Sequence, residues 1–356
     1  MFECDMHTHT VRSDGHLTPK ESIDRAVELG LKVLVISDHD TTLPLMYEID
    51  ANEHEILEVP EGDAAAESAE IDAIGIDAIA DEMRVKREIN LEDYAASIGL
   101  ELVRGTEISC DTENEDVHLV GIFCDWDAPE FLELEKEIRR SRMNGYRRMV
   151  ENLAAAGYDV SWEEVLQYAG RVDDPENVYK KQIYEYIAVK GFASDWKDGK
   201  KLVKSRPEFD PGREKPDPVD IIHLIHKTGG KVIMAHPFLV KDEVYYKGKK
   251  MTRFEYIDML IEAGLDGIEA CYPYEKTSYT GNLSSGEIER MVRDRYGNLE
   301  ESGVFLSGGS DFHGDFVTGM KNPRELGECG ISYEYYCEYV RKVEKWNLFN
   351  GEKCEK

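Results

Sequence analysis

Seven short apolar segments, several followed by a segment of helical periodicity, constrain the fold of this chain more than any other feature. Each segment is short enough for a buried strand, and many are separated by enough residues for a helix. Alternation of strands and helices at this spacing predicts an α/β protein with a parallel sheet or barrel. The predicted strands are 2–6, 32–36, 101–103, 117–123, 231–235, 267–270 and 304–306.

Two predicted helices carry clear start and stop signals. In the first, Thr18 is the predicted N-cap, Pro19 the first helical residue, Glu21 the partner in a capping box and Gly30 the stop. The second runs over 217–227, begins with Asp-Pro and is followed by two glycines before the next strand. Both are expected to pack on the sheet through one apolar face.

Two segments interrupt this alternation. Residues 46–90 are acidic and rich in alanine, which predicts a helical insertion. Residues 125–215 are rich in helix-forming patterns, and the Pro-, Gly- and charge-rich stretch 206–218 is typical of a linker. We therefore expect a barrel made of 1–124 and 216–356, and a small inserted helical domain over 125–215.

Charge and cysteine usage narrow the partners and the compartment. The net charge of -30 disfavours long nucleic acid, because affinity for its backbone comes from cationic contacts. The seven cysteines are scattered without a C-x-x-C pair, as expected for reduced thiols in a cytoplasmic protein. The sequence shows neither a secretory leader pattern nor an apolar run of membrane-spanning length, so we expect no membrane contact.

Histidines and carboxylates gather where the predicted strands end. His7 and His9 alternate within the first strand, so their side chains project to the same side and can share one ion. Six of the ten histidines in the chain lie at or beside such ends, where an α/β barrel assembles its active site. Imidazole together with carboxylate is the ligand mixture of Mn, Fe or Zn ions. The other candidate ligands are Asp14, His39, Glu107, His118, His236, Asp311 and His313. Asp38 and Asp40 flank His39 and are candidates either to orient it or to be solvated loop charges.

The ordered set resembles the PHP (polymerase and histidinol phosphatase) family, in particular its stand-alone phosphoesterases. The resemblance rests on Asp5-Met6-His7-Thr8-His9, Ser37-Asp38-His39-Asp40, Gly105-Thr106-Glu107, Ala235-His236-Pro237, Gly264-Leu265-Asp266-Gly267-Ile268-Glu269 and Ser310-Asp311-Phe312-His313. It covers 1–45, 100–124 and about 216–320 closely. It implies a distorted (β/α)7 barrel with three divalent metal ions, Mn, Fe or Zn, at the carboxyl ends of its strands.

Carried over position by position, the resemblance assigns a ligand set to each ion. One ion would be held by His7, His9, Glu107 and Asp311, a second by Glu107 as a bridge with His118 and His236, and a third by Asp14, His39 and His313. Glu107, Asp14 and His313 are the residues that we expect to act in catalysis.

Substrate selection is expected to come from the inserted segment. Its first helix has an apolar line through Ile138, Met149 and Leu153, and Arg142 lies on that line. A charge there must find an anion, either a buried carboxylate or a phosphate in the cleft, or reach solvent. The resemblance implies phosphate-binding arginines in this helix, matched by Arg142 and Arg148, although Gly145 stands where the family has another arginine.

A second departure from the family lies later in the insert. A Gly-Arg-Pro-His stretch of the family is replaced by Tyr179-Lys180-Lys181-Gln182, which keeps positive charge but loses the planar guanidinium and the imidazole. Lys180 and Gln182 are the candidate substrate-binding residues of this stretch.

Together these features predict a phosphomonoesterase that uses a metal-activated hydroxide on a small nucleotide-type substrate, such as a nucleoside bisphosphate or an AMP-like compound. Three alternatives stay open: a histidinol-phosphate-type phosphatase, a short-oligonucleotide exonuclease and a non-catalytic metal-binding regulatory module. A panel of phosphomonoesters separates the first, release of mononucleotides from short RNA identifies the second, and tight metal binding without turnover identifies the third.

Overall fold

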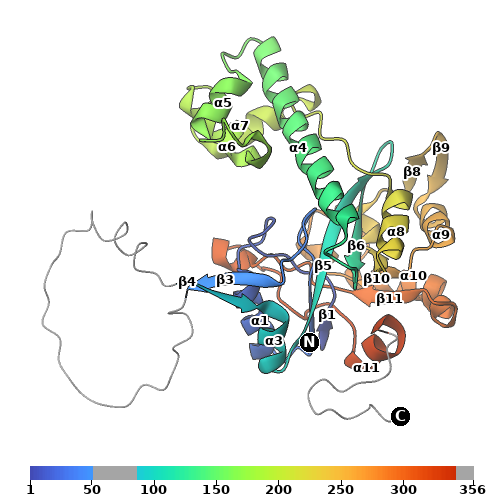
Figure 1. The fold of residues 1–356 in the computed structure, drawn as a ribbon. Coiled ribbons are helices and arrows are strands. Elements are labelled where there is room, and N and C mark those ends of the chain that lie inside the picture. Colours follow the sequence, from blue (N-terminus) through green and yellow to red (C-terminus); the bar gives the residue numbers. More distant parts are fainter. Residues whose placement is uncertain (51–85, 342–356) are drawn as a thin grey trace, which may run out of the picture.

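A computed structural model describes residues 1–50 and 86–341 of the chain. Its centre is a seven-stranded, nearly closed sheet that forms a distorted (β/α)7 barrel, as predicted (Figure 1). In sheet order the strands are β1 (Cys4–Asp5), β2 (Val33–Ile36), β5 (Glu101–Asp111), β6 (Asp116–Ile122), β7 (Lys231–Met234), β10 (Gly267–Cys271) and β11 (Phe305–Gly308). Each of the seven predicted strands corresponds to one of them.

One strand runs against the others. β6 is antiparallel to both β5 and β7, whereas the remaining neighbours in the sheet are parallel. The four residues between β5 and β6 allow a hairpin but are too few for a crossover helix. The amino end of β6 therefore lies at the carboxyl ends of the parallel strands, and His118 reaches that rim from the third position of β6.

Hydrogen bonds beyond the strand ends bring the first and last strands together. The Met6 amide donates to the Gly308 carbonyl at 3.2 Å, and the Asp311 amide donates to the His7 carbonyl at 2.9 Å. Thr8 and Phe312 form a parallel bridge. These contacts bring the first and last histidine motifs to the same rim.

Helices surround the sheet and also form a separate group (Figure 1). Thr18 and Glu21 make the predicted capping box of α1 (Pro19–Glu28). The second predicted helix is α8 (Pro218–Lys227), and the Asp217 side chain caps it. The helices are α1 (Pro19–Glu28), α3 (Leu91–Ser97), α4 (Pro129–Ala155), α5 (Trp162–Tyr168), α6 (Lys180–Val189), α7 (Trp196–Lys204), α8 (Pro218–Lys227), α9 (Arg253–Glu262), α10 (Ser285–Tyr296) and α11 (Tyr333–Tyr335). Single turns are η2 (Pro175–Asn177), η3 (Pro207–Phe209), η4 (Pro237–Leu239), η5 (Tyr274–Lys276), η6 (Gly297–Ser302) and η7 (Asp315–Thr318), and η8 (Tyr336–Arg341) is a π-helix.

Helix α4 connects two hydrophobic cores. Phe131, Leu134 and Ile138 in its first half pack with the barrel core. Met149 and Leu153 in its second half pack with α5, α6 and α7 in a separate cluster. Figure 1 shows α4 leading from the sheet to these three helices. We propose that 125–215 is an inserted domain on the barrel, with α4 as the shared element.

The expectation of a helical insertion over 46–90 is wrong at both ends. β3 (Met46–Asp50) and β4 (Lys86–Asn90) form an antiparallel pair instead. Tyr47 and Ile49 turn inward while Met46 and Glu48 are exposed, an alternation that the acidic composition conceals. The rest of the predicted insertion, 51–85, lies outside the described residues.

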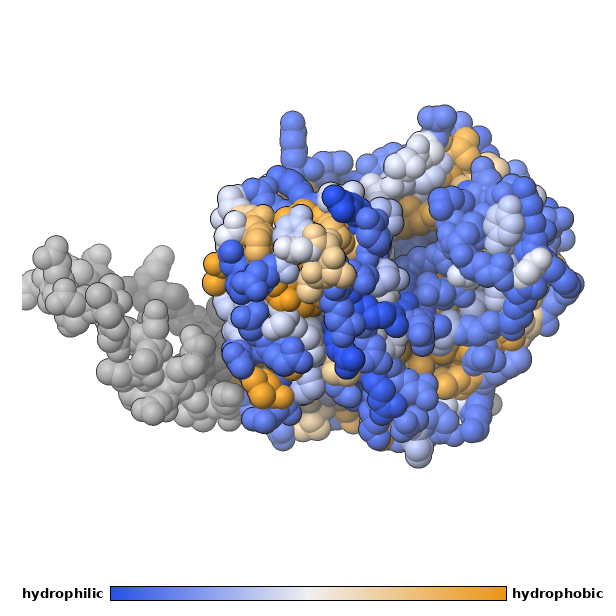
Figure 2. Space-filling view, turned by 90° about the horizontal axis from the view of Figure 1, so that it is seen from above, coloured by the Kyte–Doolittle hydropathy of each residue, from blue (hydrophilic) through white to orange (hydrophobic). Residues whose placement is uncertain are grey.

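The hairpin formed by β8 (Glu243–Tyr246) and β9 (Lys249–Thr252) was not among the predicted elements. Hydrophilic residues cover most of the face seen in Figure 2, in keeping with the strongly charged composition. Within 1–50 and 86–341, every helix is too short or too polar to cross a bilayer.

Candidate metal centre

The centre of the site is one fully buried carboxylate, Glu107, in the middle of β5. Its Oε2 lies 3.2 Å from Nε2 of both His7 and His9, and 3.0 Å from Nδ1 of His39. Its Oε1 lies 2.8 Å from Nδ1 of His118 and 3.0 Å from Nε2 of His236. Five imidazoles from four segments of the chain thus converge on a single side chain.

Two buried polar atoms of this cluster make no hydrogen bond, which suits a site that binds cations. Glu107 Oε2 and His39 Nδ1 are buried and lie 3.0 Å apart, yet the geometry gives neither atom a hydrogen bond to the other or to any group of the described chain. Buried polar atoms are normally hydrogen-bonded, so such atoms at the centre of a histidine cluster are suited to bind a cation. Imidazole nitrogens and carboxylate oxygens suit Mn, Fe or Zn. The donor set fits divalent ions.

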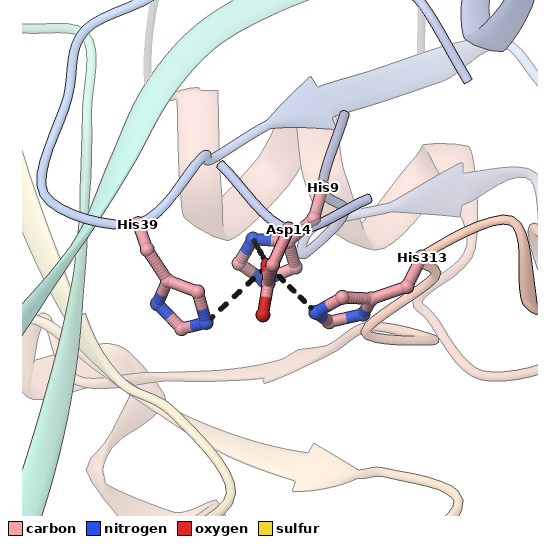
Figure 3. A group of neighbouring side chains, drawn as sticks. All are labelled: His9, Asp14, His39 and His313. Carbon is pink, nitrogen blue, oxygen red and sulfur yellow. Dashed lines mark ion pairs between the residues drawn. The ribbon is translucent and has the colours of Figure 1, made fainter. Parts of the chain in front are cut away.

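A second group lies at the open side of the site. The Asp14 carboxylate faces the rings of His9, His39 and His313, as Figure 3 shows. Asp14 Oδ1 lies 3.1 Å from His313 Nε2, 3.8 Å from His39 Nε2 and 4.0 Å from His9 Nδ1. The Asp14 side chain is 59% exposed, whereas Glu107 is buried, so Asp14 lies at the solvent-exposed margin of the site.

Two further groupings have ligand atoms close enough to share an ion: His7 with His9 and Glu107, and His39 with Glu107 and His118. Asp311 adjoins the first, with its Oδ1 3.1 Å from His9 Nε2. All nine predicted metal ligands therefore lie at one rim of the barrel. The grouping differs in detail from the prediction, because His9 and His39 each lie between two groups.

The pKa shifts of the clustered residues also favour cation binding at this site. Burial lowers the pKa of His118, but Glu107 and Asp116 beside it raise it to about 10 overall. Burial also opposes the charged form of Glu107, but the surrounding histidines hold the pKa of that carboxyl well below its usual range. The carboxylate is thus anionic at neutral pH and attracts positive charge.

Buried residues behind the ligands fix their orientation. Glu269 Oε1 lies 3.3 Å from His7 Nδ1, and its Oε2 accepts the His236 amide at 2.6 Å. The Tyr272 hydroxyl and Arg324 Nη1 both donate to Asp311 Oδ2, at 2.7 and 2.6 Å. Such partners hold metal ligands in place and set their basicity.

Asp38 and Asp40, next to His39, have different structural roles. Asp38 is buried and accepts hydrogen bonds from the Thr10 amide, the Thr10 hydroxyl and the Ser13 hydroxyl, each at 2.7 Å. It thereby holds the turn that carries Asp14. Asp40 accepts the Ser109 amide at 3.1 Å and pairs with Arg213.

The backbone is strained at this rim. His236 has φ 27° and Asp311 has φ 50°, values that non-glycine residues seldom adopt. Gly309 packs so closely that an added Cβ would lie 2.3 Å from the Cβ of His7. Strained backbone at two of the candidate ligands is in keeping with a functional site.

The sequence itself matches a known family at these residues. The model of the PHP domain matches residues 5–193, more than half of the chain. The chain belongs to the PHP domain family. The matched span includes His7, His9, Asp14, His39, Glu107 and His118, whereas His236, Asp311 and His313 lie beyond it.

Several characterised relatives are similar over much of their length. A 3',5'-nucleoside bisphosphate phosphatase of Chromobacterium violaceum is 25% identical over 88% of this chain and 88% of its own length. The 5'-3' exoribonuclease Rnm of Salmonella typhimurium is 29% identical over 65% of this chain and 64% of its own. A phosphoribosyl 1,2-cyclic phosphate 1,2-diphosphodiesterase of Eggerthella lenta is 23% identical over 88% of this chain and 94% of its own.

Solved structures agree on the fold. A provisionally assigned metal-dependent phosphoesterase of Bifidobacterium adolescentis superposes with a TM-score of 0.58 at 24% identity, over 95% of both chains. An amidohydrolase of Chromobacterium violaceum with bound sulfate and no metal gives 0.51 at 23% identity, over 87% of both chains.

A cationic cavity of about 290 Å³ lies between α4 and the linker that returns to the barrel. Its four cations are Arg142, Lys180, Arg213 and Lys215. Lys180 pairs with Asp210 at 2.6 Å, Arg213 with Asp40, and Lys215 with Asp116 at 2.6 Å. Arg142 differs: within the described residues it has no ion pair, and its buried Nε has no hydrogen-bond partner.

The remaining predicted substrate residues lie outside this cavity. Arg148 donates to the Gly212 carbonyl at 3.2 Å, and Gln182 accepts the Tyr179 amide at 2.9 Å to cap α6. Gly145 lines the cavity, and a Cβ there would lie 2.8 Å from the Gly212 carbonyl oxygen. Close packing of the linker thus explains why this position is a glycine and not the arginine that the PHP family has there.

Sequence reasoning missed Tyr272 and Arg324 as partners of Asp311, and Arg213 as a lining residue. Tyr272 follows the predicted strand that contains Glu269, so its position was a usable signal. Arg324 and Arg213 lie in loops without a regular pattern, and their contacts depend on tertiary packing alone.

Proposed function

We propose that this protein is a metal-dependent phosphoesterase that hydrolyses a small nucleotide-type phosphomonoester, such as a nucleoside bisphosphate or an AMP-like compound, at a trinuclear site. The observation that carries the proposal is the buried Glu107 carboxylate with five imidazoles around it and an unsatisfied Oε2. Membership of the PHP family and the activity named for the bisphosphate phosphatase relative support the same class.

The nine side chains at the rim would hold the ions, with Mn, Fe and Zn all compatible with the ligand types. When bound, divalent ions supply a water nucleophile at neutral pH and charge compensation for the phosphoryl oxygens. Glu107 would contribute to more than one ion because its two oxygens face different histidines.

The other residues of the chain position the substrate and the ligands. Asp14 and His313 lie at the open side, where they would meet the entering phosphate, and Asp38 fixes the turn that carries Asp14. Arg324 and Tyr272 hold Asp311 through one of its oxygens, which leaves Oδ1 directed to His9. Arg142 would bind a substrate phosphate, since its guanidinium has no anionic partner within residues 1–50 and 86–341.

A short oligonucleotide is the second candidate substrate. The relative named as a 5'-3' exoribonuclease, which is 29% identical over 65% of this chain, favours it.

The test is a substrate panel on protein purified without chelator and supplied with Mn, Fe or Zn. Adenosine 3',5'-bisphosphate, adenosine 5'-monophosphate, histidinol phosphate and a 5'-phosphorylated trinucleotide separate the candidates. We expect phosphate release from the bisphosphate with the highest kcat/KM. Metal binding without hydrolysis of any of the four would contradict the proposal and favour a regulatory role.

A further inference from the structure

A second, larger cavity opens beside the metal cleft. It has a volume of about 610 Å³ and lies between the segment after β7, the start of α9 and the loop 278–283. Leu239 and Ser278 line both this cavity and the cleft that contains Glu107 and His236. The two spaces are therefore neighbours, with Leu239 and Ser278 in the wall of each.

Arg253 is the fixed cation of this cavity. The residue is only 9% exposed, its Nε donates to the Val240 carbonyl at 2.8 Å, and its guanidinium lies 4.2 Å from the centre of the Phe238 ring. These contacts orient the guanidinium before any ligand arrives. Nη2 lies 2.6 Å from Asp242, whose side chain is 93% exposed, so water weakens this pair.

The charge of Arg253 is thus poorly compensated. Its contacts use Nε and Nη2, and no partner of Nη1 is found among residues 1–50 and 86–341. Burial lowers the pKa of Arg253 although Asp242 opposes the shift. A buried, pre-oriented and incompletely paired guanidinium suits a phosphate group.

The loop opposite Arg253 is polar and anchored. Ser278, Thr280 and Asn282 line the cavity and offer hydroxyl and amide groups. Tyr279 anchors the loop, because its ring packs edge-on against Tyr274 and its hydroxyl accepts the Leu283 amide at 3.4 Å. The wall therefore provides hydrogen-bonding groups suited to a sugar or a phosphate.

We infer that this Arg253 cavity is a substrate subsite that binds a second phosphate group, separate from the one hydrolysed at the metal centre. The inference rests on the proposed function. The Arg142 cavity connects to β2 and β6 through the pairs of Arg213 with Asp40 and Lys215 with Asp116. The Arg253 cavity lies beside β7 and β10, so the two cavities occupy different sectors of the rim.

Adenosine 3',5'-bisphosphate and adenosine 5'-monophosphate, which differ by one phosphate, provide the test on the full-length, metal-loaded protein. Arg253→Gln is expected to lower kcat/KM at least about tenfold for the bisphosphate, the order of a lost charged hydrogen bond. The value for the monophosphate should stay within about twofold. Thr280→Trp, at an exposed loop position, should give the same selective loss by filling the cavity.

Ligand binding can also be measured without hydrolysis. Calorimetry with a bisphosphonate analogue of the bisphosphate should show weaker binding to both variants and unchanged binding to Arg295→Gln, an exposed arginine on α10 paired with Asp258. Equal losses on both nucleotides, or no loss in either cavity variant, would overturn the subsite. Wild-type protein that hydrolyses neither nucleotide nor p-nitrophenyl phosphate would instead overturn the proposed function.

Discussion

The sequence predicted functional residues both at the metal centre and in the inserted segment, but the structure brings together the predicted residues in only the first of these regions. At the rim, all nine predicted ligands converge on one site. In the insert, of the predicted substrate residues only Arg142 of α4 and Lys180 of α6 line a common cavity, while Arg148 and Gln182 bind local backbone groups. Strand ends place their side chains by topology, whereas a long polar side chain on a helix is placed by whatever packs beside it.

The largest loss of activity is expected from a substitution of Glu107, the central carboxylate of the metal site. Glu107→Gln keeps the shape of the side chain but removes the charge that faces five histidines. We expect the rate to fall at least about a thousandfold, beyond the 10–100-fold typical of residues that only orient ligands. Elemental analysis should show that the variant has lost bound metal. Full activity with full metal content would exclude Glu107 as a shared ligand.

Arg142→Ala tests the one α4 residue that has a substrate role in our account. We expect kcat/KM to fall by about 2–3 kcal/mol for every phosphoester turned over, the order for a lost buried charge contact. Because Arg142 lacks an ion pair within the described chain, the melting temperature should not fall.

Arg142→Lys should recover only part of the loss, since an ammonium group cannot make a bidentate contact. Arg147→Ala is the matched control, an exposed arginine on the same helix paired with Glu151. An earlier melting transition that accounts for the kinetic loss would assign Arg142 a structural role instead.

The smallest effect is expected at Gln182. Its side-chain oxygen caps α6, so Gln182→Ala should cost about 0.5–1 kcal/mol of stability. Its kcat/KM should change less than about twofold. Thermal melting and kinetics on one preparation check both values, and a kinetic loss without a stability change would return Gln182 to the substrate site.

Much of the fold could be predicted because apolar segments and helix caps are local signals. The strands and the caps at Thr18 and Asp217 follow from residues a few positions apart. The antiparallel direction of β6 was not predicted, because it depends on the length of the connection between β5 and β6. Strand β3 was not predicted, because acidic residues conceal its alternation of buried and exposed side chains. Gly145 shows why the site could be predicted only in part. A glycine is needed there because the carbonyl of Gly212, which is distant in sequence, packs against it.

Metal content tests the central claim most directly. Protein purified without chelator and reloaded with Mn, Fe or Zn should contain two to three divalent ions per chain, as expected for a multi-metal hydrolase. Phosphoesterase activity should rise and fall with that content on chelation and reloading. Less than one ion per chain, with no activation by any of the three metals, would contradict the account.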